Sequence, residues 1–510
     1  MILLTHTGEK VVDIVDLNNN KPISIDVKNP AKALLDLAKN YQERILIWAH
    51  TSQKENINIE GVKASFYLKN MMLSFSNHQY LPEQIGYVED SPFLKVNKKV
   101  KYPTWLMSSN VGAIHASQLL KFENKVKLNL PFDFVLNSMA KLGMPNGLFC
   151  YSEPKLLLEN NIGFNLPKAS TVQLFMFVKQ HYKGIWSLLF PLNFMVFEKR
   201  FPILTFIRTI LVKKHKFSSN FDLQPLEKQS QNIDNITIDV IIPTLGRKAF
   251  LHDVLLDLEK QTLLPQQVII IEQNEDENST TELNFISNKT WPFKIVHKFI
   301  HQTGACNARN LALKEVISDY VFFADDDIRF PTNFIEVSLY KMRRHQFDAV
   351  TLSCLQKKDK KTHLKPIQWS TFGSGCSIVK SECLKNLTFD MNYEFGFGED
   401  ADFGMQLRKK GIDIIYLHEP EIEHLKAPIG GFRKPHEHIW AKYGDKPKPS
   451  PTITFYKLMH QTKKQLKGYK MVLFFKFYLV QSIKNPFKYY KTFKKQWRQS
   501  VYWANQMIDK

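Results

Sequence analysis

The sequence has few cysteines and no motif built from them. Its 510 residues include five cysteines, an odd number, without a C-x-x-C pair. This argues against a disulfide framework and a structural zinc site, and it favours a reducing compartment. The N-terminus lacks a basic segment, a long apolar run and a small-residue cleavage site, so a signal peptide is not predicted. We therefore expect a cytoplasmic protein.

Long hydrophobic runs are absent as well. The two most apolar stretches, residues 184–216 and 471–480, are interrupted by charged residues or prolines, and neither reaches the roughly 20 residues that a spanning helix needs. With 44% hydrophobic and 23% charged residues, the composition is that of a folded globular protein. The length favours two to four domains over a single core.

Acidic residues are scarce at the C-terminal end. Residues 433–510 contain 18 Lys and Arg against three Asp and Glu, and so carry +15 of the net charge of +20. Aromatic residues lie between these lysines. Two interpretations stay open: helices that pack on another domain with a solvated basic face, and an amphipathic element on an anionic membrane surface. No nucleic acid is expected as a partner, because no recognised nucleic-acid-binding module accompanies the charge.

Residues 236–430 alternate short apolar runs with amphipathic ones. Strands are predicted at 236–244 (ITIDVIIPT), 266–275 (QQVIIIEQNE) and 320–324 (YVFFA). Helices are predicted between them, at 249–261 and 303–317, where apolar residues recur at helical spacing. Near-continuous apolar strands separated by helices predict a mainly parallel sheet that is covered on both faces. The fold class is therefore α/β.

Polar residues follow each of the three predicted strands. Thr244 and Arg247 follow the first, Glu272 ends the second, and Asp325, Asp326 and Asp327 follow the third. In such sheets ligands bind beyond the carboxyl ends of the strands. We therefore expect one polar crevice that is built from separate parts of the chain.

The three adjacent aspartates point to a metal. Their carboxylates repel one another, and a hard divalent cation with its preference for oxygen ligands would neutralise them. Asp325 and Asp327 would point to one side of the strand and Asp326 to the other. A turn or a helix N-cap after the strand explains the triplet equally well.

A second acidic group opens a helix in the segment GEDADFGMQLRKKG, residues 398–411. Capping and the helix dipole alone favour acids such as Glu399 and Asp400 at this place. The glycines at 396 and 398 favour a functional role, because glycine lets a substrate approach the backbone. A carboxylate there could accept a proton from an attacking hydroxyl as a general base.

The order of these segments resembles a family 2 glycosyltransferase of the GT-A fold. The matching segments over residues 236–430 are VIIPTLGR, IIIEQNE, GACNARNLAL, FFADDD, GSGCSIVKSE, GEDADFGMQLRKKG and IEHLKAP. The resemblance implies inverting transfer of a sugar from a nucleotide-diphosphate donor. The acceptor would be a hydroxyl of a glycan or lipid-linked glycan, as in polysaccharide biosynthesis.

The resemblance also implies roles for single residues. Asp400 would be the catalytic base, and Asp325 with Asp327 would form the metal-binding D-x-D motif for Mn or Mg. His424 matches a position that supplies a further metal ligand in related enzymes, although a packed or surface histidine is an equally good interpretation. Glu272 stands where the family commonly has Asp. The substrate-binding residues would be Thr244, Arg247, Glu272, Arg309, Asp326, Gly375 and Glu399.

The first 165 residues echo the same pattern. The segment SNVGAIHASQLL, residues 109–120, resembles GSGCSIVKSECL, residues 373–384, and DFVLNSMAKLG resembles ADFGMQLRKKG. In this alignment Phe132 stands opposite Asp400, with Asp133 one residue beyond, and Glu89 and Asp90 replace the three aspartates. We expect a degenerate, inactive copy, with an unrelated α/β domain as the alternative.

The sequence thus predicts four segments. They are a degenerate glycosyltransferase-like domain (1–165), an apolar and basic linker (166–235), a GT-A catalytic domain (236–430) and a basic aromatic helical region (431–510). The leading interpretation is a metal-dependent, inverting glycosyltransferase, cytoplasmic or peripheral on the inner face of the cell membrane. The alternative is a catalytically inactive protein of the same fold that binds nucleotide sugar or glycan. The enzyme interpretation requires that the acids near 326 and Asp400 face each other across one cavity.

Overall fold

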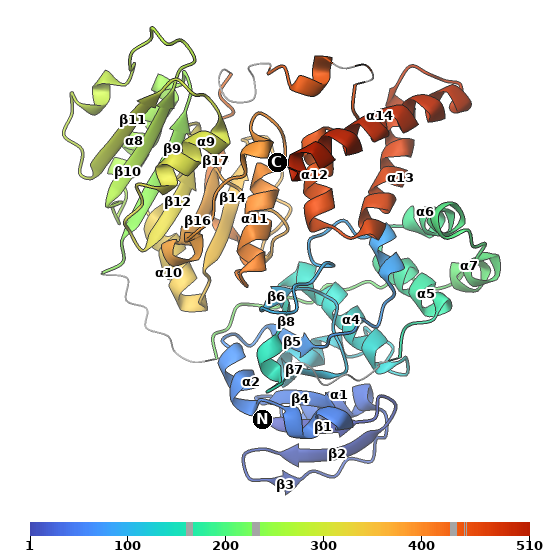
Figure 1. Cartoon of the computed structure of the whole chain (residues 1–510). Helices are drawn as coiled ribbons and strands as arrows, with labels where there is room; N and C mark the ends of the chain where they lie inside the picture. Colours follow the sequence, from blue (N-terminus) through green and yellow to red (C-terminus); the bar gives the residue numbers. More distant parts are fainter. Residues whose placement is uncertain (160–166, 227–234, 429–435, 443, 445, 510) are drawn as a thin grey trace. The chain divides into compact units, whose positions relative to one another are not determined.

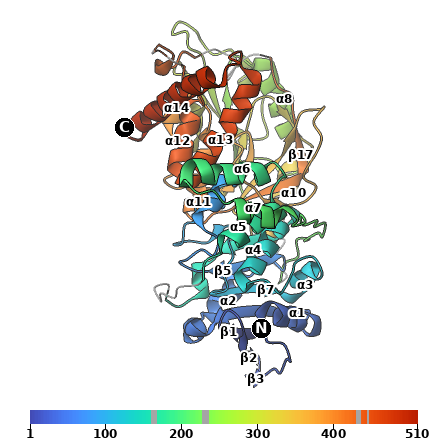
Figure 2. The same ribbon diagram turned by 90° about the vertical axis from the view of Figure 1, so that its right-hand side faces the viewer.

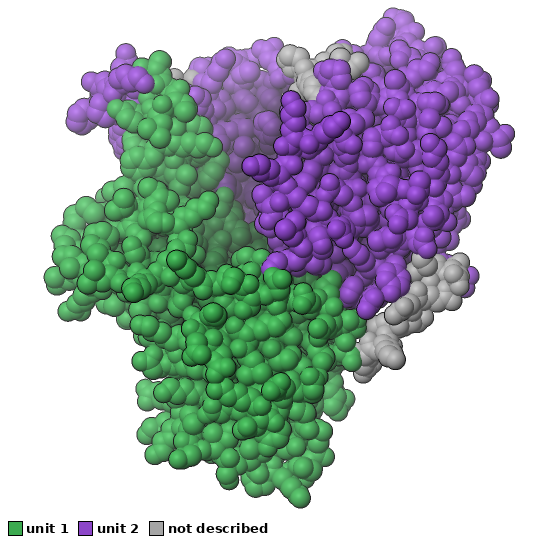
Figure 3. All heavy atoms as spheres, turned by 180° about the vertical axis from the view of Figure 1, so that it is seen from behind, with its two compact units in different colours: residues 1–228, 461–482 green, residues 229–460, 483–510 purple. Residues whose placement is uncertain are grey.

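The computed structural model describes the chain except for residues 160–166, 227–234, 429–435, 443, 445 and 510. The chain divides into two compact units (Figure 3). Unit 1 comprises residues 1–228 and 461–482, and unit 2 comprises residues 229–460 and 483–510. The predicted boundaries at 165, 166 and 431, and the start of the basic region at 433, lie outside the described residues.

Unit 2 is built on a nine-stranded sheet with the order β11-β10-β9-β12-β16-β14-β17-β13, in which β15 also pairs with β17 (Figure 1). The four strands from β11 to β12 are parallel, and β14 is parallel to β17. The predicted α/β fold is confirmed. The strands are β9 (Ile238–Thr244), β10 (Gln267–Gln273), β11 (Lys294–Ile300), β12 (Tyr320–Ala324), β13 (Ile328–Arg329), β14 (Ala349–Leu355), β15 (Ile367–Gln368), β16 (Cys376–Lys380) and β17 (Ile414–His424).

Helices cover both faces of this sheet, and the apolar side chains of one strand enter both cores. Phe323 of β12 packs against Phe403 of α11, whereas its neighbour Phe322 packs against Phe334 of α10. This alternation follows from the two-residue period of a strand. The helices of unit 2 are α8 (Lys248–Glu259), α9 (Ala305–Leu313), α10 (Phe334–His345), α11 (Glu399–Lys409), α12 (Pro451–His460) and α14 (Pro486–Ile508).

The helical C-terminal region that the sequence predicts is confirmed, and its helices pack by their apolar sides. Helices α12 and α14 lie against each other, with Thr454 Oγ1 2.6 Å from Ser500 Oγ in a fully buried contact. In α14 the buried residues Tyr489, Phe493 and Trp497 recur at helical spacing. No helix among the described residues is long and apolar enough to cross a membrane.

Unit 1 is a second α/β unit, with an eight-stranded sheet of the order β3-β2-β1-β4-β7-β5-β8-β6. Its strands are β1 (Ile2–His6), β2 (Val11–Asp16), β3 (Lys21–Pro22), β4 (Ile45–His50), β5 (Met71–Phe75), β6 (Tyr102–Pro103), β7 (Val111–His115) and β8 (Phe149–Ser152). Its helices are α1 (Pro30–Asn40), α2 (Ile59–Ser65), α3 (Ala116–Leu119), α4 (Phe132–Gly143), α5 (Thr171–His181), α6 (Trp186–Asn193), α7 (Ile203–Ile210) and α13 (Lys463–Val480). Within this unit α5 contacts α6 and α7, and α6 contacts α13 (Figure 2).

Six strands of unit 1 pair in the same order as six strands of unit 2. The order is β1-β4-β7-β5-β8-β6 in unit 1 and β9-β12-β16-β14-β17-β13 in unit 2. In both units the five successive pairs are parallel, antiparallel, antiparallel, parallel and antiparallel. This shared strand order supports a degenerate copy at the N-terminus, which stays a prediction; the chain order differs at the edge strand, because β6 follows β5 whereas β13 precedes β14.

The strand order corrects the expected counterpart of Asp325, Asp326 and Asp327 in unit 1. β4 occupies the position of β12 in the shared order, and His50 and Thr51 follow it. Glu89, which the alignment placed there, instead follows β5 and the 3₁₀ helix Glu83–Tyr87, and pairs with Lys141. The position that carries three carboxylates in unit 2 therefore carries none in unit 1.

Helix α4 shows that the alignment of the two units is off by one residue. Asp133, and not Phe132, is the second residue of α4, as Asp400 is the second residue of α11. Ser109 donates to Asp133 from its backbone N–H at 2.8 Å and from its hydroxyl at 2.7 Å. Burial raises the pKa of the Asp133 carboxyl, against the lowering effect of these bonds.

Candidate active site

Asp326 points into the sheet and is held by two side chains from the neighbouring strand end. Thr244 Oγ1 at the end of β9 donates to Asp326 Oδ2 at 2.7 Å, and Arg247 at the start of α8 donates to Oδ1 at 2.6 Å. Asp326 is 2% exposed. Burial raises its pKa to about 6, although Arg247 and Thr244 act in the opposite direction. The predicted residues Thr244, Arg247 and Asp326 thus form one buried cluster.

Asp325 and Asp327 lie on the other side of the strand, near His424. One ligand atom from each of these three residues lies within 4.8 Å of the others. His424 is the last residue of β17 and is brought there by the short pairing of β13 with β17, in which Ile328 stands opposite His424. Two carboxylate oxygens and an imidazole nitrogen form a donor set that Mn or Mg can use. The grouping fits a divalent cation.

Asp327 is kept ionised by its surroundings. It receives the Ala427 N–H at 2.8 Å, and His424 Nε2 and Arg247 Nη1 each lie 3.4 Å from its carboxylate. Burial acts to raise the pKa of Asp327, but these hydrogen bonds and charges outweigh it and hold the pKa at about 2. The hydrogen bond to Asp327 also raises the pKa of His424. Asp327 is therefore a carboxylate over the whole physiological range.

Gly375 lets β16 approach the aspartates. It precedes β16, and its carbonyl accepts the Asp325 N–H at 3.3 Å. A Cβ at this position would lie 2.0 Å from Asp325 Oδ2. The backbone of residue 375 therefore has to be a glycine if the Asp325 carboxylate is to keep its place.

Asp400 lies in the first turn of α11 and is only partly hydrogen-bonded. Ser374, next to Gly375, bonds Asp400 through its side chain and its backbone. Oδ1 of Asp400 is shielded from solvent and has no hydrogen-bond partner among the described residues, although the residue as a whole keeps some exposure. Burial raises the pKa of Asp400, against the lowering effects of Arg309 and Ser374. The side chain is thus tethered by Ser374 and has one acceptor oxygen that no described residue uses.

Arg309 joins the two acidic groups. Its guanidinium donates to Asp325 Oδ1 at 3.2 Å, and the charges of Asp325, Asp400 and Glu399 together keep its pKa raised despite burial. Asp325 and Asp400 also act on each other electrostatically. The structure therefore brings the predicted acids of β12 and α11 to one place, around the single side chain of Arg309.

Glu399 has an unusual protonation equilibrium. Burial and the neighbouring charge of Asp400 raise its pKa to about 7, while Arg309 acts in the opposite direction. A carboxyl group with this pKa changes its charge near neutral pH.

Glu272 lies beside Thr244 in the sheet but forms a cluster of its own. The two residues are opposite each other in the β9 and β10 pairing. The Glu272 carboxylate accepts from Thr281 Oγ1 at 2.5 Å and from Glu282 N–H at 3.0 Å, and lies 2.8 Å from His297 Nε2. Its predicted nucleoside contact stays a prediction.

Glu394 was missed by the sequence interpretation. Its carboxylate accepts the N–H groups of Cys306 and Asn307 at the start of α9, at 3.1 and 2.8 Å. A carboxylate is a favourable partner for the free N–H groups of a helix N-terminus. Glu394 thereby anchors the helix that presents Arg309. It lies far from α9 in the chain, so no local signal could reveal the role.

Two contacts with α12 fix the start of α11, and the second corrects an expectation. Asp402, the third acid of its first turn, lies 2.6 Å from the buried His460 Nε2 of α12 and is held there as a structural anchor. The open side of Gly396 does not admit a substrate, because a Cβ there would lie 2.6 Å from the Thr452 side chain. Both contacts come from α12, whose docking could not be predicted from the sequence.

Most of this site lies in a segment that matches a known protein family. The family model described as "Glycosyl transferase family 2" matches residues 239–410. This range contains every predicted site residue except His424. An uncharacterized glycosyltransferase of Rickettsia conorii is 30% identical over 117 residues, which are 23% of this chain and 19% of that protein. The match thus spans less than a fifth of that relative.

Solved structures match the chain with low scores. S. aureus TarS in complex with UDP-GlcNAc matches with a TM-score of 0.36 and 16% identity, over 54% of this chain and 81% of that chain. GalNAc-T7 with UDP, GalNAc and Mn²⁺ matches with a TM-score of 0.33 and 12% identity, over 38% of this chain and 44% of that chain.

Proposed function

Residues 239–410 are a glycosyl transferase family 2 domain, and from this premise we propose that the chain is an inverting, metal-dependent sugar transferase. The donor is a nucleotide-diphosphate sugar. The acceptor is a hydroxyl of a glycan or lipid-linked glycan, in the synthesis of a polysaccharide. The observation that carries the proposal is that Asp325, which groups with Asp327 and His424, also interacts with Arg309 and Asp400.

The charge of the site supports metal dependence. Five acids, at 325, 326, 327, 399 and 400, interact with two arginines, Arg247 and Arg309. This excess of negative charge would repel a diphosphate unless a cation is present. Asp325, Asp327 and His424 would hold Mn or Mg, and the metal when bound supplies positive charge to the diphosphate of the donor.

Asp400 is the residue that removes the acceptor proton. Its Oδ1 has no partner among the described residues, the residue keeps some exposure through which an acceptor hydroxyl can approach the carboxylate, and the Ser374 contact fixes the orientation of the carboxyl group. The raised pKa makes Asp400 a stronger base than an exposed aspartate. Attack of the hydroxyl in a single displacement inverts the anomeric carbon and leaves no covalent intermediate.

Arg309 links the metal ligands to the catalytic base. Its guanidinium is held by Asp325 and interacts with Asp400, so it lies between the metal ligands and the base. A fixed positive charge there stabilises the negative charge that develops on the departing diphosphate. Thr244, Arg247 and Asp326, predicted to bind the substrate, bond one another beside the metal ligands, and we propose that they contact the donor from there. We propose Gly375, Glu272 and Glu399 as residues that line the donor or the acceptor.

A screen of nucleotide sugars for release of nucleoside diphosphate tests the function. We expect slow release from one donor with added Mn²⁺, and its loss with a chelator. UDP-GlcNAc, the ligand of the TarS structure, belongs among the donors. A chain that binds a nucleotide sugar but never releases diphosphate, with or without glycan acceptors, would instead support the inactive binding protein.

For the location of the chain we propose the inner surface of a membrane. Helix α7 of unit 1 exposes Leu204 by 73% and Ile207 by 56%, and Leu211 after it by 88%. Arg208 on the same helix and Lys213 and Lys214 after it are basic. Exposed apolar side chains beside basic ones suit the headgroup region of an anionic membrane. This surface would place the transferase near a lipid-linked acceptor.

A further inference from the structure

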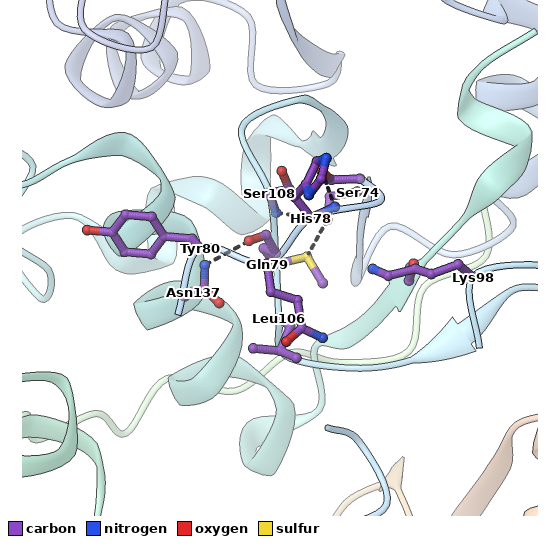
Figure 4. A pocket seen from close by; sticks show the side chains of 11 residues that line it. Ser74, His78, Gln79, Tyr80, Lys98, Leu106, Ser108 and Asn137 are labelled. Carbon is purple, nitrogen blue, oxygen red and sulfur yellow. Dashed lines mark hydrogen bonds between the residues drawn. The ribbon is translucent and has the colours of Figure 1, made fainter. Parts of the chain in front are cut away.

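Unit 1 contains a polar cavity that belongs to none of the sites described above. Its lining includes Ser74 of β5, Ser152 at the end of β8, Asn137 of α4, and Lys98 from the segment before β6 (Figure 4). The ends of β5 and β8 are the carboxyl ends of two parallel neighbours, where ligands bind in α/β sheets. The cavity thus lies where such a unit offers a binding site.

Two lining side chains have buried oxygens without partners. Asn137 Nδ2 donates to the carbonyls of Met107 and Asp133, both at 2.7 Å, so the orientation of the amide is fixed. Its Oδ1 then has no partner among the described residues, and neither has Ser152 Oγ. Both residues are 1% exposed. Buried polar atoms are nearly always hydrogen-bonded in native proteins, so a bound group is expected here.

Lys98 adds a charge to the same cavity. In Figure 4 its amine points toward the other labelled side chains, whereas the Tyr80 hydroxyl points away from them. Burial lowers the pKa of Lys98 to about 8, and no carboxylate of a described residue forms an ion pair with it. Among the residues that the structure describes, no aspartate or glutamate lines the cavity. Lys98 is half-buried, and its amine lies 6.0 Å from the centroid of the Phe75 ring.

The size of the cavity limits what can enter. It has about 270 Å³ of empty space including its open mouth, and its enclosed part has room for one water-sized group. A water molecule would form hydrogen bonds with Asn137 Oδ1 and Ser152 Oγ but would bring no anion to Lys98.

We propose that unit 1 binds a hydroxylated anion in this cavity, namely a sugar or polyol that carries a carboxylate or a phosphate. An acid oxygen pairs with Lys98, while one hydroxyl group in the enclosed part donates to the Asn137 oxygen and accepts from the Ser152 hydroxyl. The remainder of the ligand lies in the mouth of the cavity. This binding function is independent of the transfer reaction, and it gives the N-terminal unit a role in binding without catalysis.

Calorimetric titration of the full chain tests the proposal. The probes are glucuronate, glycerol 1-phosphate, and their neutral counterparts glucose and glycerol. We expect binding of at least one anion, with the two anions distinguishing a carboxylate from a phosphate ligand, and much weaker binding of both neutral probes. Lys98→Met should weaken binding of that anion roughly tenfold or more, the effect of losing a charged hydrogen bond.

Two further variants keep the test decisive. Lys99→Met removes the same charge from the exposed neighbouring residue and should leave binding unchanged. Ser152→Ala, which removes one oxygen and little volume, should weaken binding by about threefold to tenfold even if Lys98→Met fails to fold. Absence of binding by both anions, equal binding of the neutral probes, or unchanged affinity in folded Lys98→Met and Ser152→Ala would overturn the proposal. None of the probes carries a nucleotide, so these outcomes do not depend on the transferase activity.

Discussion

The Asp400 side chain combines a fixed orientation with an open acceptor. Ser374 holds the carboxyl group, Oδ1 has no partner among the described residues, and Arg309 offsets part of its charge. Such a carboxylate is arranged to receive a proton from a group that is not yet present. A purely structural helix cap would instead bond the backbone of its own first turn.

Asp400→Asn should therefore abolish transfer and keep binding. The amide has nearly the same shape but cannot accept the proton, so we expect the rate to fall by about 10² to 10⁴-fold. Nucleotide affinity should change little. Steady-state kinetics and calorimetric titration measure the two quantities.

Asp359→Asn is the matched control, because Asp359 is exposed in the same unit. It should keep the activity of the unchanged chain. Full activity of Asp400→Asn would show that another group is the base.

As the pH is lowered, the rate of transfer should begin to fall at a higher pH than an ordinary aspartate base would give. Asp400 must be ionised to act as a base, and burial raises its pKa. Activity is therefore present above that raised pKa and lost as the pH falls through it, by about tenfold per pH unit. Since Glu399 and Asp400 repel each other, Glu399→Gln should move this acid limb of the profile to lower pH. The profile of kcat/KM against pH measures this.

Glu55→Gln, at an exposed residue of unit 1, should leave the profile where it was. An acid limb that Glu399→Gln moves to higher pH, or does not move, would contradict the electrostatic assignment.

The sequence could predict the acids but not their supports. Asp325 and Asp327 follow a strongly apolar strand, and Asp400 opens a helix, so local patterns are sufficient to find them. Ser374 and Glu394 act through contacts that the fold alone creates. Their partners lie tens of residues away in the chain, and no local pattern marks them.

At the scale of elements, the site depends on how closely β16 approaches the end of β12. Cys376 pairs with Ala324, which places Gly375 beside Asp325. The available space is fixed by the two backbones, because the strand pairing holds both.

Gly375→Ala should weaken metal binding. The new Cβ would lie 2.0 Å from Asp325 Oδ2, so the carboxylate has to leave its place near Asp327 and His424. We expect an affinity for Mn²⁺ that is roughly 10 to 100-fold lower. Electron paramagnetic resonance titration of free Mn²⁺ measures it.

Gly184→Ala serves as the control, because a Cβ there meets no atom within 4 Å. It should bind Mn²⁺ as the unchanged chain does. If Gly375→Ala did so too, Asp325 would not be a ligand.

The distance from each helix start to its glycine explains the misplaced alignment of the two units. Gly143 is the last residue of α4, 11 positions after Phe132, whereas Gly411 lies two residues beyond the end of α11, 12 positions after Glu399. An alignment that starts from these two glycines therefore loses its register by one residue at the N-terminal acids. The apolar strands were predictable because their burial on both faces leaves a continuous pattern.

At the scale of the whole molecule, the C-terminal region contributes helices to both units. Helix α13 belongs to unit 1, with Met471 and Leu473 buried, whereas α12 and α14 belong to unit 2. The sequence could not separate them, because all three are basic and aromatic. Removing residues 452–510 would expose apolar surface in both units, so point substitutions are the better test of membrane binding.

Leu204→Ser combined with Ile207→Ser should release the chain from membranes. Two exposed apolar side chains of α7 lose their contact with the lipid, and we expect binding that is at least about tenfold weaker. Sedimentation with vesicles that contain phosphatidylserine measures the bound fraction.

Ile317→Ser combined with Leu364→Ser is the control, because both residues are exposed apolar side chains of unit 2, at 65% and 67%. This variant should sediment as the unchanged chain does. Equal sedimentation of the α7 variant would exclude α7 as the membrane contact.

The most direct measurement is anomalous diffraction at the manganese edge from crystals of Asp400→Asn with Mn²⁺ and the donor found by the screen. The account predicts one manganese peak bound by Asp325, Asp327 and His424, with the donor diphosphate on it and residue 400 facing the anomeric carbon. Manganese at another place, or a sugar turned away from residue 400, would contradict it.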